Sequence, residues 1–231
     1  MNALAIEQSQ DVHSQRFNDR TTPLHLASKE GQLGAARILV EHGAGAAAKD
    51  GVGSTPLRWA SESGHVELAR FLVEHGADAA AKDEGGWTPL HRASSVGHME
   101  FAWFLVEHGA DTTAKDFVGS TPLHWASSMG HLELGQFLVE HGADAAAKDA
   151  VDRTPLHGAS DGGHVKLARF LVEHGTDITA KDRVGSTPLH RASFGGHLEL
   201  ARSLVEHGAD VAAEDVGGLT PQHRASEGGH L

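Results

Sequence analysis

The sequence predicts an all-α protein in which pairs of short helices repeat along the chain as a solenoid, joined by β-turns or hairpins. The first observation is a strict period, because the dipeptide Thr-Pro recurs seven times at intervals of 33 residues. Its threonines are Thr22, Thr55, Thr88, Thr121, Thr154, Thr187 and Thr220. The second observation is that each period carries the signals that begin and end two helices. No stretch remains for a separate catalytic domain.

The period divides the chain into a polar N-terminal extension or partial cap at 1–16 and a repeat array at 17–231. The array comprises six full copies (17–49, 50–82, 83–115, 116–148, 149–181, 182–214) and a partial seventh (215–231). We expect Leu4 and Ile6 to cover the first copy. The last copy stops before its second helix, and repeat arrays need a polar cap. The chain is therefore interpreted as a fragment of a longer protein, or as one that self-associates through its uncapped C-terminal end.

The first helix of each copy follows from its Thr-Pro pair. In the fourth copy Thr121 suits the N-cap, proline suits the first helical position, and small residues continue the helix to Ser127. Gly130 ends it. A second helix is predicted from His131 to His141, and Gly142 takes the usual C-terminal cap position.

The second helix is predicted to be amphipathic, and the link between copies is predicted to be a turn. In the second copy the spacing buries one set of side chains and exposes another. The buried set is Leu68, Ala69 and Leu72, and the exposed set is Glu67, Arg70 and Glu74. Residues 80–86 combine small, charged and glycine residues, which indicates an extended turn or hairpin.

This pattern resembles the ankyrin repeat across residues 17–231. The motifs that carry the resemblance are Thr88-Pro89-Leu90-His91, Gly97-His98 and His108-Gly109-Ala110-Asp111. The resemblance implies a right-handed solenoid in which the turns and first helices line a concave groove and the second helices form the convex back. It also implies a protein-interaction scaffold without chemistry of its own.

The composition excludes several classes of function. Thirty-one Asp and Glu against 19 Lys and Arg give a net charge of −12, so neither nucleic acid nor an anionic membrane surface is an expected partner. The absence of cysteine excludes disulfides, thiol catalysis and Cys-ligated zinc. No apolar run approaches the ~20 residues of a membrane span, and the N-terminus does not resemble a signal peptide. We expect an intracellular protein, cytoplasmic or nuclear, with no cofactor.

The 19 histidines suggest metal binding, but 18 of them occupy three repeated positions. They are His25, His91, His124, His157, His190 and His223 in the Thr-Pro-Leu-His motif; His65, His98, His131, His164, His197 and His230 at the start of the second helix; and His42, His75, His108, His141, His174 and His207 before the capping glycine. The resemblance implies that the first group hydrogen-bonds between adjacent turns. Buried neutral imidazoles would lower stability at acid pH, because their pKa values lie below the unfolded ~6.5.

Specific recognition is expected where the copies differ from one another. The position after Thr-Pro-Leu-His, here called the slot, reads Leu26, Trp59, Arg92, Trp125, Gly158, Arg191 and Arg224. Turn tips and first-helix ends vary as well, and Trp, Arg, Phe and Met are enriched in interfaces. The candidate binding residues are Trp59, Trp87, Arg92, Phe117, Trp125, Met129, Arg153, Gly158, Asp161, Arg191, Phe194 and Arg224. The plainer interpretation is that the tryptophans fill space and the arginines pair with nearby acids.

The fifth copy departs most from the others. Gly158 is predicted to leave a notch between Trp125 and Arg191, with Arg153 and Asp161 nearby, where an acidic or aromatic group of a partner would bind. In the same copy Asp152 replaces the turn glycine, and Asp tolerates a left-handed backbone.

These observations favour a noncatalytic module, not an enzyme, that binds a partner protein or peptide in its groove. The alternative is that the groove binds a small organic molecule, or performs acid–base chemistry on it, near Trp125, Gly158 and Arg191. The polar groups in this alternative are His124, His157, Asp161 or Arg153. A purely structural spacer would be expected to have uniform turn tips, which this chain lacks.

Overall fold

The computed structural model describes residues 20–230, and within them it shows thirteen α-helices and no strand. The predicted extension at 1–16, with Leu4 and Ile6, lies outside the described residues, as does Leu231. The helices are α2 (Pro23–Lys29), α3 (Leu33–Glu41), α4 (Pro56–Ser63), α5 (Val66–Glu74), α6 (Pro89–Val96), α7 (Met99–Glu107), α8 (Pro122–Met129), α9 (Leu132–Glu140), α10 (Pro155–Asp161), α11 (Val165–Glu173), α12 (Pro188–Phe194), α13 (Leu198–Glu206) and α14 (Pro221–Glu227).

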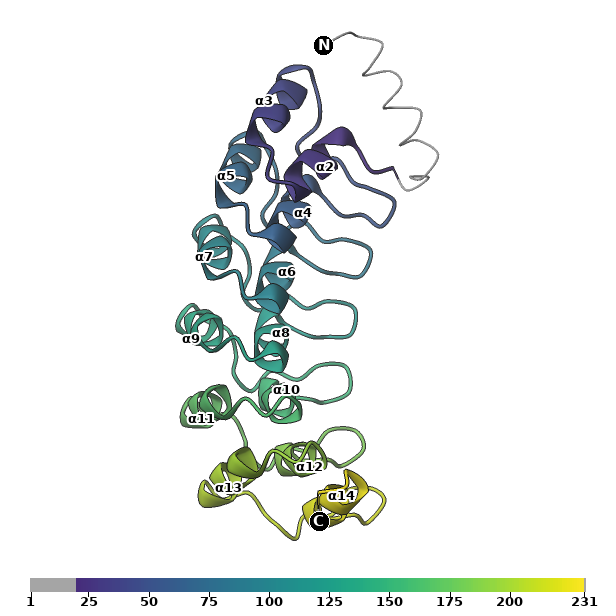
Figure 1. The fold of residues 1–231 in the computed structure, drawn as a ribbon, viewed down its shortest axis with the longest axis vertical. Helices are drawn as coiled ribbons and strands as arrows, with labels where there is room; N and C mark the ends of the chain where they lie inside the picture. Colours follow the sequence, from purple (N-terminus) through teal and green to yellow (C-terminus); the bar gives the residue numbers. More distant parts are fainter. Residues whose placement is uncertain (1–19, 231) are drawn as a thin grey trace. The chain divides into compact units, whose positions relative to one another are not determined.

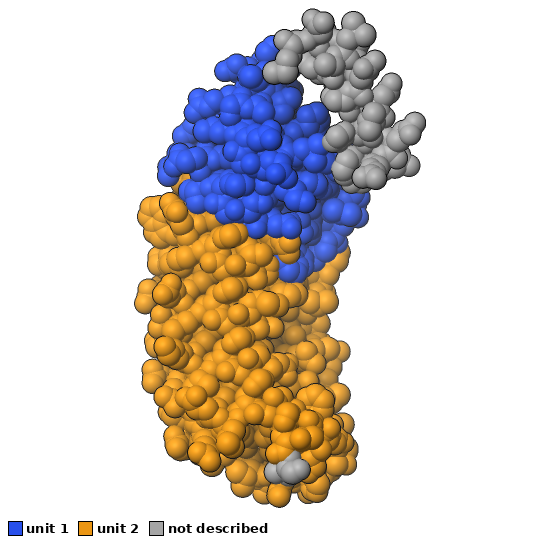
Figure 2. All heavy atoms as spheres, viewed as in Figure 1, with its two compact units in different colours: residues 1–89 blue, residues 90–231 orange. Residues whose placement is uncertain are grey.

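The chain forms two compact units, coloured separately in Figure 2. Unit 1 comprises residues 1–89 and carries α2 to α5, whereas unit 2 comprises residues 90–231 and carries α7 to α14 and all of α6 except Pro89. The division into 33-residue copies stays a prediction from the sequence.

Within each unit, the first helices of neighbouring copies pack on one another, and so do the second helices. In unit 1, α2 packs against α4, and α3 packs against α5. In unit 2 the first helices α8, α10, α12 and α14 lie in one row and the second helices α7, α9, α11 and α13 in another, with loops projecting beside the first row (Figure 1). The predicted all-α repeat fold is confirmed.

The predicted helix boundaries agree with the structure to within one or two residues in the fourth copy. Thr121 has an extended backbone, Pro122 opens α8, and the His124 side chain returns to the backbone of Thr121 to complete a capping box. Gly130 ends α8 with φ of 76°, in the left-handed region that glycine adopts without steric cost. The helix α9 follows and ends before His141.

The core of unit 2 is built from the repeated leucine and alanine positions. Leu123 and Ala126 of α8 and Leu138 of α9 have no exposed surface. The buried and exposed faces predicted for the second helix are confirmed in α5, where Leu68, Ala69 and Leu72 are buried and Glu67, Arg70 and Glu74 are exposed. No helix within residues 20–230 is long and apolar enough to cross a membrane.

Hairpin turns link the copies, as predicted. At one tip the Asp116 N–H donates to the Ser120 carbonyl at 3.0 Å, and Asp116 Oδ1 accepts the N–H groups of Val118 and Ser120. Successive tips are joined through their backbones, since the Ala150 N–H donates to the Val118 carbonyl at 2.8 Å. Equivalent bonds join Arg183 to Val151 and Val216 to Val184, each at 3.0 Å. The turns of unit 2 therefore form one hydrogen-bonded series.

Asp152 occupies the left-handed position of its turn, as the sequence predicts. Its φ is 63°, where the corresponding Gly119 of the preceding turn has a φ of 75°. Asp is among the residues that tolerate this conformation, so the turn keeps its shape without a glycine.

Candidate binding site

The histidines of the Thr-Pro-Leu-His motif are structural. Nδ1 of His124 accepts a hydrogen bond from the Thr121 N–H at 3.1 Å, so Nε2 carries the proton and donates to the Arg153 carbonyl of the next turn at 3.0 Å. His25, His91, His157 and His190 bind the next turn through Nε2 in the same way. Burial lowers the pKa of His124, and it lowers the pKa of His157 to about 4. The predicted hydrogen bond to the next turn is confirmed for these five histidines, whereas His223, within the described residues, bonds only to Thr220 through Nδ1. The lowered pKa values of His124 and His157 favour the neutral imidazole.

The other two histidine positions also serve the fold. Before the second helix, the His164 Nε2 hydrogen-bonds to the Ser128 carbonyl at 3.1 Å. After the helix, the His141 Nδ1 hydrogen-bonds to the Phe137 carbonyl at 2.8 Å, and the two rings lie 4.1 Å apart. The described part of the chain contains no group of three or more His, Asp or Glu side chains that could hold a metal ion.

Most side chains in the slot bind the aspartate that lies nine residues earlier in the chain. The indole N–H of Trp125 donates to Asp116 Oδ2 at 3.1 Å, and that of Trp59 donates to Asp50 Oδ2 at 3.0 Å. The guanidinium groups of Arg191 and Arg224 bind Oδ2 of Asp182 and Asp215. The aspartates nine residues before the slot are here called the turn aspartates, and these four connect a first helix to its hairpin. The slot residues thus have a structural role whether or not they also touch a partner.

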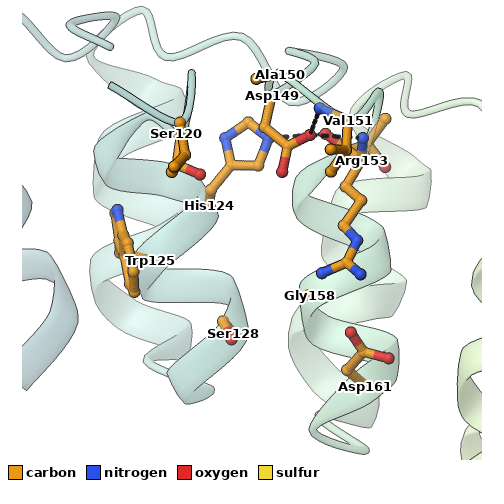
Figure 3. Close-up of a pocket in the computed structure, with 12 residues that line it drawn as sticks. Ser120, His124, Trp125, Ser128, Asp149, Ala150, Val151, Arg153, Gly158 and Asp161 are labelled. Carbon is orange, nitrogen blue, oxygen red and sulfur yellow. Dashed lines mark hydrogen bonds between the residues drawn. The ribbon is translucent and has the colours of Figure 1, made fainter. Parts of the chain in front are cut away.

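A cavity of about 390 Å³ opens in unit 2 beside the one slot that holds a glycine. Its walls include Trp125 of α8, Gly158 and Asp161 of α10, and Asp149 and Arg153 of the intervening hairpin (Figure 3). The structure therefore brings together four of the twelve candidate residues. Arg191, expected on the other side of the notch, does not line this cavity, because its guanidinium binds Asp182 and its Nε lies 3.9 Å from Asp161 Oδ1.

Opposite charges lie close together at the edge of the cavity. The Arg153 guanidinium and the Asp161 carboxylate point toward each other (Figure 3), and Arg153 Nε lies 3.9 Å from Asp182 Oδ2. Burial raises the pKa of Asp161, against the opposing effect of Arg191 and Arg153. Burial also acts to raise the pKa of Asp182, but hydrogen bonds from Arg191 and from the Ser186 N–H outweigh it and lower that pKa.

The remaining candidates lie elsewhere. Trp59 and Trp87 belong to unit 1 and are half-buried, as are Arg92 of α6 and Arg224 of α14 in unit 2. Phe117 is 77% exposed at a hairpin tip, and Met129 and Phe194 are exposed at the ends of α8 and α12.

The structure also reveals surface residues that the sequence analysis missed. Exposed apolar side chains follow one another on the hydrogen-bonded tips of unit 2 and form what we call the tip strip: Phe117, Val118, Val151, Val184 and Val216. The recurrence of valine two residues after the aspartate of successive copies could have revealed most of it. Asp149 was missed as well, although an aspartate nine residues before the slot recurs in every copy from the second onward.

Comparisons with known proteins agree with this architecture. The family model for ankyrin repeats in three copies matches residues 1–83, 45–116, 80–149 and 116–182, and the model for a single ankyrin repeat matches residues 184–216. Among solved structures, the ankyrin repeat domain of human ASB11 is similar, with 27% identity, a TM-score of 0.82, and coverage of 89% of this chain and 92% of that one. Comparison with curated protein sequences gives no match.

Proposed function

Because the chain belongs to the ankyrin repeat family, whose repeats are generally protein–protein interaction modules, we propose that it is a noncatalytic module that binds a partner protein or peptide. The binding surface comprises the hairpin tips and first helices of the array at 17–231. In unit 2 it includes the tip strip and the cavity beside Gly158.

The tip strip is the observation that carries this proposal. Phe117 and Val216 are each 77% exposed, and Val118 is 59% exposed. Leaving large apolar side chains in water forgoes about 1.5–3 kcal/mol of burial for each, and contiguous exposed apolar surface commonly marks an interaction site. Since hydrogen bonds between tips hold these side chains in a series, they offer a partner a preformed apolar surface.

Polar groups beside the strip supply specificity. Arg153 and Asp161 lie at the edge of the cavity and keep part of their surface exposed. An apolar centre with a charged rim is the usual anatomy of a protein interface. Met129 and Phe194 are further exposed apolar side chains, at the ends of α8 and α12.

A second candidate function is the binding of a small organic molecule, which the cavity itself favours. Its volume of about 390 Å³ falls within the range of about 300–1,000 Å³ that is typical of ligand pockets. The imidazole of His124 lines the cavity with both nitrogens already hydrogen-bonded, so in this candidate it shapes the wall instead of transferring protons.

Capture from cell extract followed by mass spectrometry tests the proposal. Three forms of the full chain are immobilised: the wild type, Phe117→Ser/Val118→Ser on the tip strip, and Trp103→Ser as the matched control. Trp103 is 48% exposed on α7, so the control removes a comparable exposed side chain from a second helix. Circular dichroism establishes that all three are folded.

We expect the wild type and Trp103→Ser to capture the same proteins, and Phe117→Ser/Val118→Ser to lose at least one of them about tenfold, since central apolar residues carry most of the affinity of an interface. Equal capture by all three forms would move the interface away from the tip strip. Absence of any captured protein, together with a thermal shift caused by a small molecule, would favour the second candidate.

A further inference from the structure

One turn aspartate in unit 2 lacks the partner that its counterparts have. In the neighbouring copies Asp116 Oδ2 accepts the indole N–H of Trp125, and Asp182 Oδ2 binds Arg191. Asp149 is the equivalent aspartate of the fifth copy, but its slot residue is Gly158, which has no side chain to donate. Oδ1 of Asp149 still accepts two backbone N–H groups of its turn. Among the described residues, no hydrogen bond or ion pair reaches its Oδ2.

The missing side chain leaves space as well as an unpaired oxygen. Asp149 and Gly158 both line the cavity of about 390 Å³, together with the Trp125 side chain (Figure 3). The cavity therefore combines an acceptor, an aromatic ring and the volume that a slot side chain occupies in other copies.

The charges around the cavity favour a cation over an anion. The two guanidiniums nearby, those of Arg153 and Arg191, are matched by Asp161 and Asp182. Asp116 and Asp149 have no cation within 4 Å among the described residues, since Trp125 supplies only a neutral donor to Asp116. The chain as a whole carries a net charge of −12, which strengthens the negative potential.

We propose that this cavity receives the side chain of one arginine from the partner, which donates to Asp149 Oδ2 and packs on Trp125. This inference rests on the proposed function, and it specifies one residue type of the partner, the arginine that enters this cavity. The acidic group suggested by the sequence fits less well, because Arg191 is already bound to Asp182 and an anion would face Asp149 and Asp161.

Arginine suits the position because the chain itself uses it there. Arg224 donates to Oδ2 of its turn aspartate through both Nε and Nη2, and Arg191 donates to Asp182 through Nη2. A guanidinium is planar, more weakly hydrated than an ammonium group, and packs on aromatic rings. A partner arginine in this cavity would reproduce across an interface the pair that the next copy makes within the chain.

The test is an NMR titration of the full-length ¹⁵N-labelled protein with N-acetyl-arginine methylamide. The readout is the indole N–H signal of Trp125, with that of Trp59, which makes the same bond to Asp50 in unit 1, as the internal control. N-acetyl-citrulline methylamide, which has nearly the same shape without the charge, serves as the matched probe.

We expect a saturable shift of the Trp125 signal only, and affinity about tenfold weaker for the citrulline probe, because hydrogen bonds between charged groups are the stronger ones. Asp149→Asn should lower the affinity for the arginine probe by a similar factor. Gly158→Arg should abolish binding of this probe, because its side chain fills the cavity. Asp144→Asn removes the same charge from an exposed turn outside the cavity and should leave the affinity unchanged.

The proposal is overturned if Trp125 shows no saturable shift, if Trp59 and Trp125 shift alike, or if Asp149→Asn and Asp144→Asn behave identically. Because the titration contains no partner protein, such a result leaves the proposed function intact. That function fails separately, through equal capture by the wild type and Phe117→Ser/Val118→Ser.

Discussion

The indole nitrogen of Trp125 donates a hydrogen bond to Oδ2 of Asp116 at 3.1 Å, nine residues earlier in the chain. Oδ1 of the same carboxylate accepts two backbone N–H groups of the hairpin. One aspartate therefore joins a turn to the helix that follows it. The side chain in the slot, which the sequence suggests as a contact for a partner, is at the same time part of this internal connection.

Trp125→Phe should lower the free energy of unfolding by about 1–2 kcal/mol, because it removes a hydrogen bond to a charged group and keeps most of the ring volume. Urea denaturation monitored by circular dichroism measures the change. Trp103→Phe is the matched control, since Trp103 is exposed on α7, and it should change the free energy by less than about 0.5 kcal/mol. An equal effect of the two substitutions would contradict the stabilising role of the Trp125–Asp116 bond.

Gly158→Arg should stabilise the fold, since an arginine in the slot can bind Asp149 as Arg191 binds Asp182. Gly158→Ala separates the two contributions: either residue gains about 1 kcal/mol of helix propensity over glycine, but only arginine adds the ion pair. A new Cβ meets Ser128 at 3.3 Å, so a shift of a few tenths of an ångström is required. In urea denaturation we expect the free energy of unfolding to be highest for Gly158→Arg, lower for Gly158→Ala and lowest for the wild type. If Gly158→Arg is less stable than Gly158→Ala, the ion pair with Asp149 is refuted.

Gly119→Ala should destabilise the protein more than Gly218→Ala, although both glycines occupy the same turn position with φ of 75° and 71°. Alanine at such a φ costs about 1 kcal/mol in either turn. At Gly119 the added Cβ would also lie 2.7 Å from the backbone nitrogen of Ala150, whereas at Gly218 nothing lies within 4 Å. Thermal denaturation compares the two variants. Equal losses would show that the close packing of successive tips contributes little to stability.

Stability should fall as the pH is lowered, because the pKa values of His124, His157 and His190 are lowered in the folded state by burial. In the unfolded chain these histidines become protonated near pH ~6.5, whereas in the folded chain they stay neutral to lower pH. The unfolded state therefore binds more protons between the unfolded and the folded pKa values, and lowering the pH favours it. For His157, with a folded pKa of about 4, the window runs from pH 6.5 to 4 and costs roughly 3 kcal/mol in all. Below about pH 4 stability falls further, because the folded state lowers the pKa values of Asp182 and Asp215 and the unfolded chain therefore binds these protons first.

The melting temperature measured at intervals between about pH 7 and pH 4 tests this dependence. The same series at about 1 M NaCl, where the Debye length is only about 3 Å, separates buried histidines from screened surface charges. A melting temperature that does not change down to pH 5 would contradict the assignment of neutral buried imidazoles.

Sequence reasoning predicted the helices well because their signals are local. Thr121 and Pro122 begin α8 and Gly130 ends it through backbone preferences that act within one turn of the chain. The role of His124 was also predictable, but only through the family resemblance, since its partner is the Arg153 carbonyl 29 residues later. Asp149 was not predicted as a possible contact, because an aspartate at this position is expected to bind the backbone N–H groups of its own turn. Only the structure shows that Oδ1 makes these bonds and that Oδ2 makes none among the described residues.

The sequence by itself determined the period, the helix boundaries, the buried leucine and alanine face, and the presence of a glycine where other copies carry tryptophan or arginine. These follow from residue types and short-range geometry. Only the tertiary structure decided that Arg191 binds Asp182, that Asp149 keeps a free oxygen facing a cavity with Trp125, and that exposed valines follow one another on bonded tips. Those relationships depend on how neighbouring copies pack, which sets distances between residues far apart along the chain.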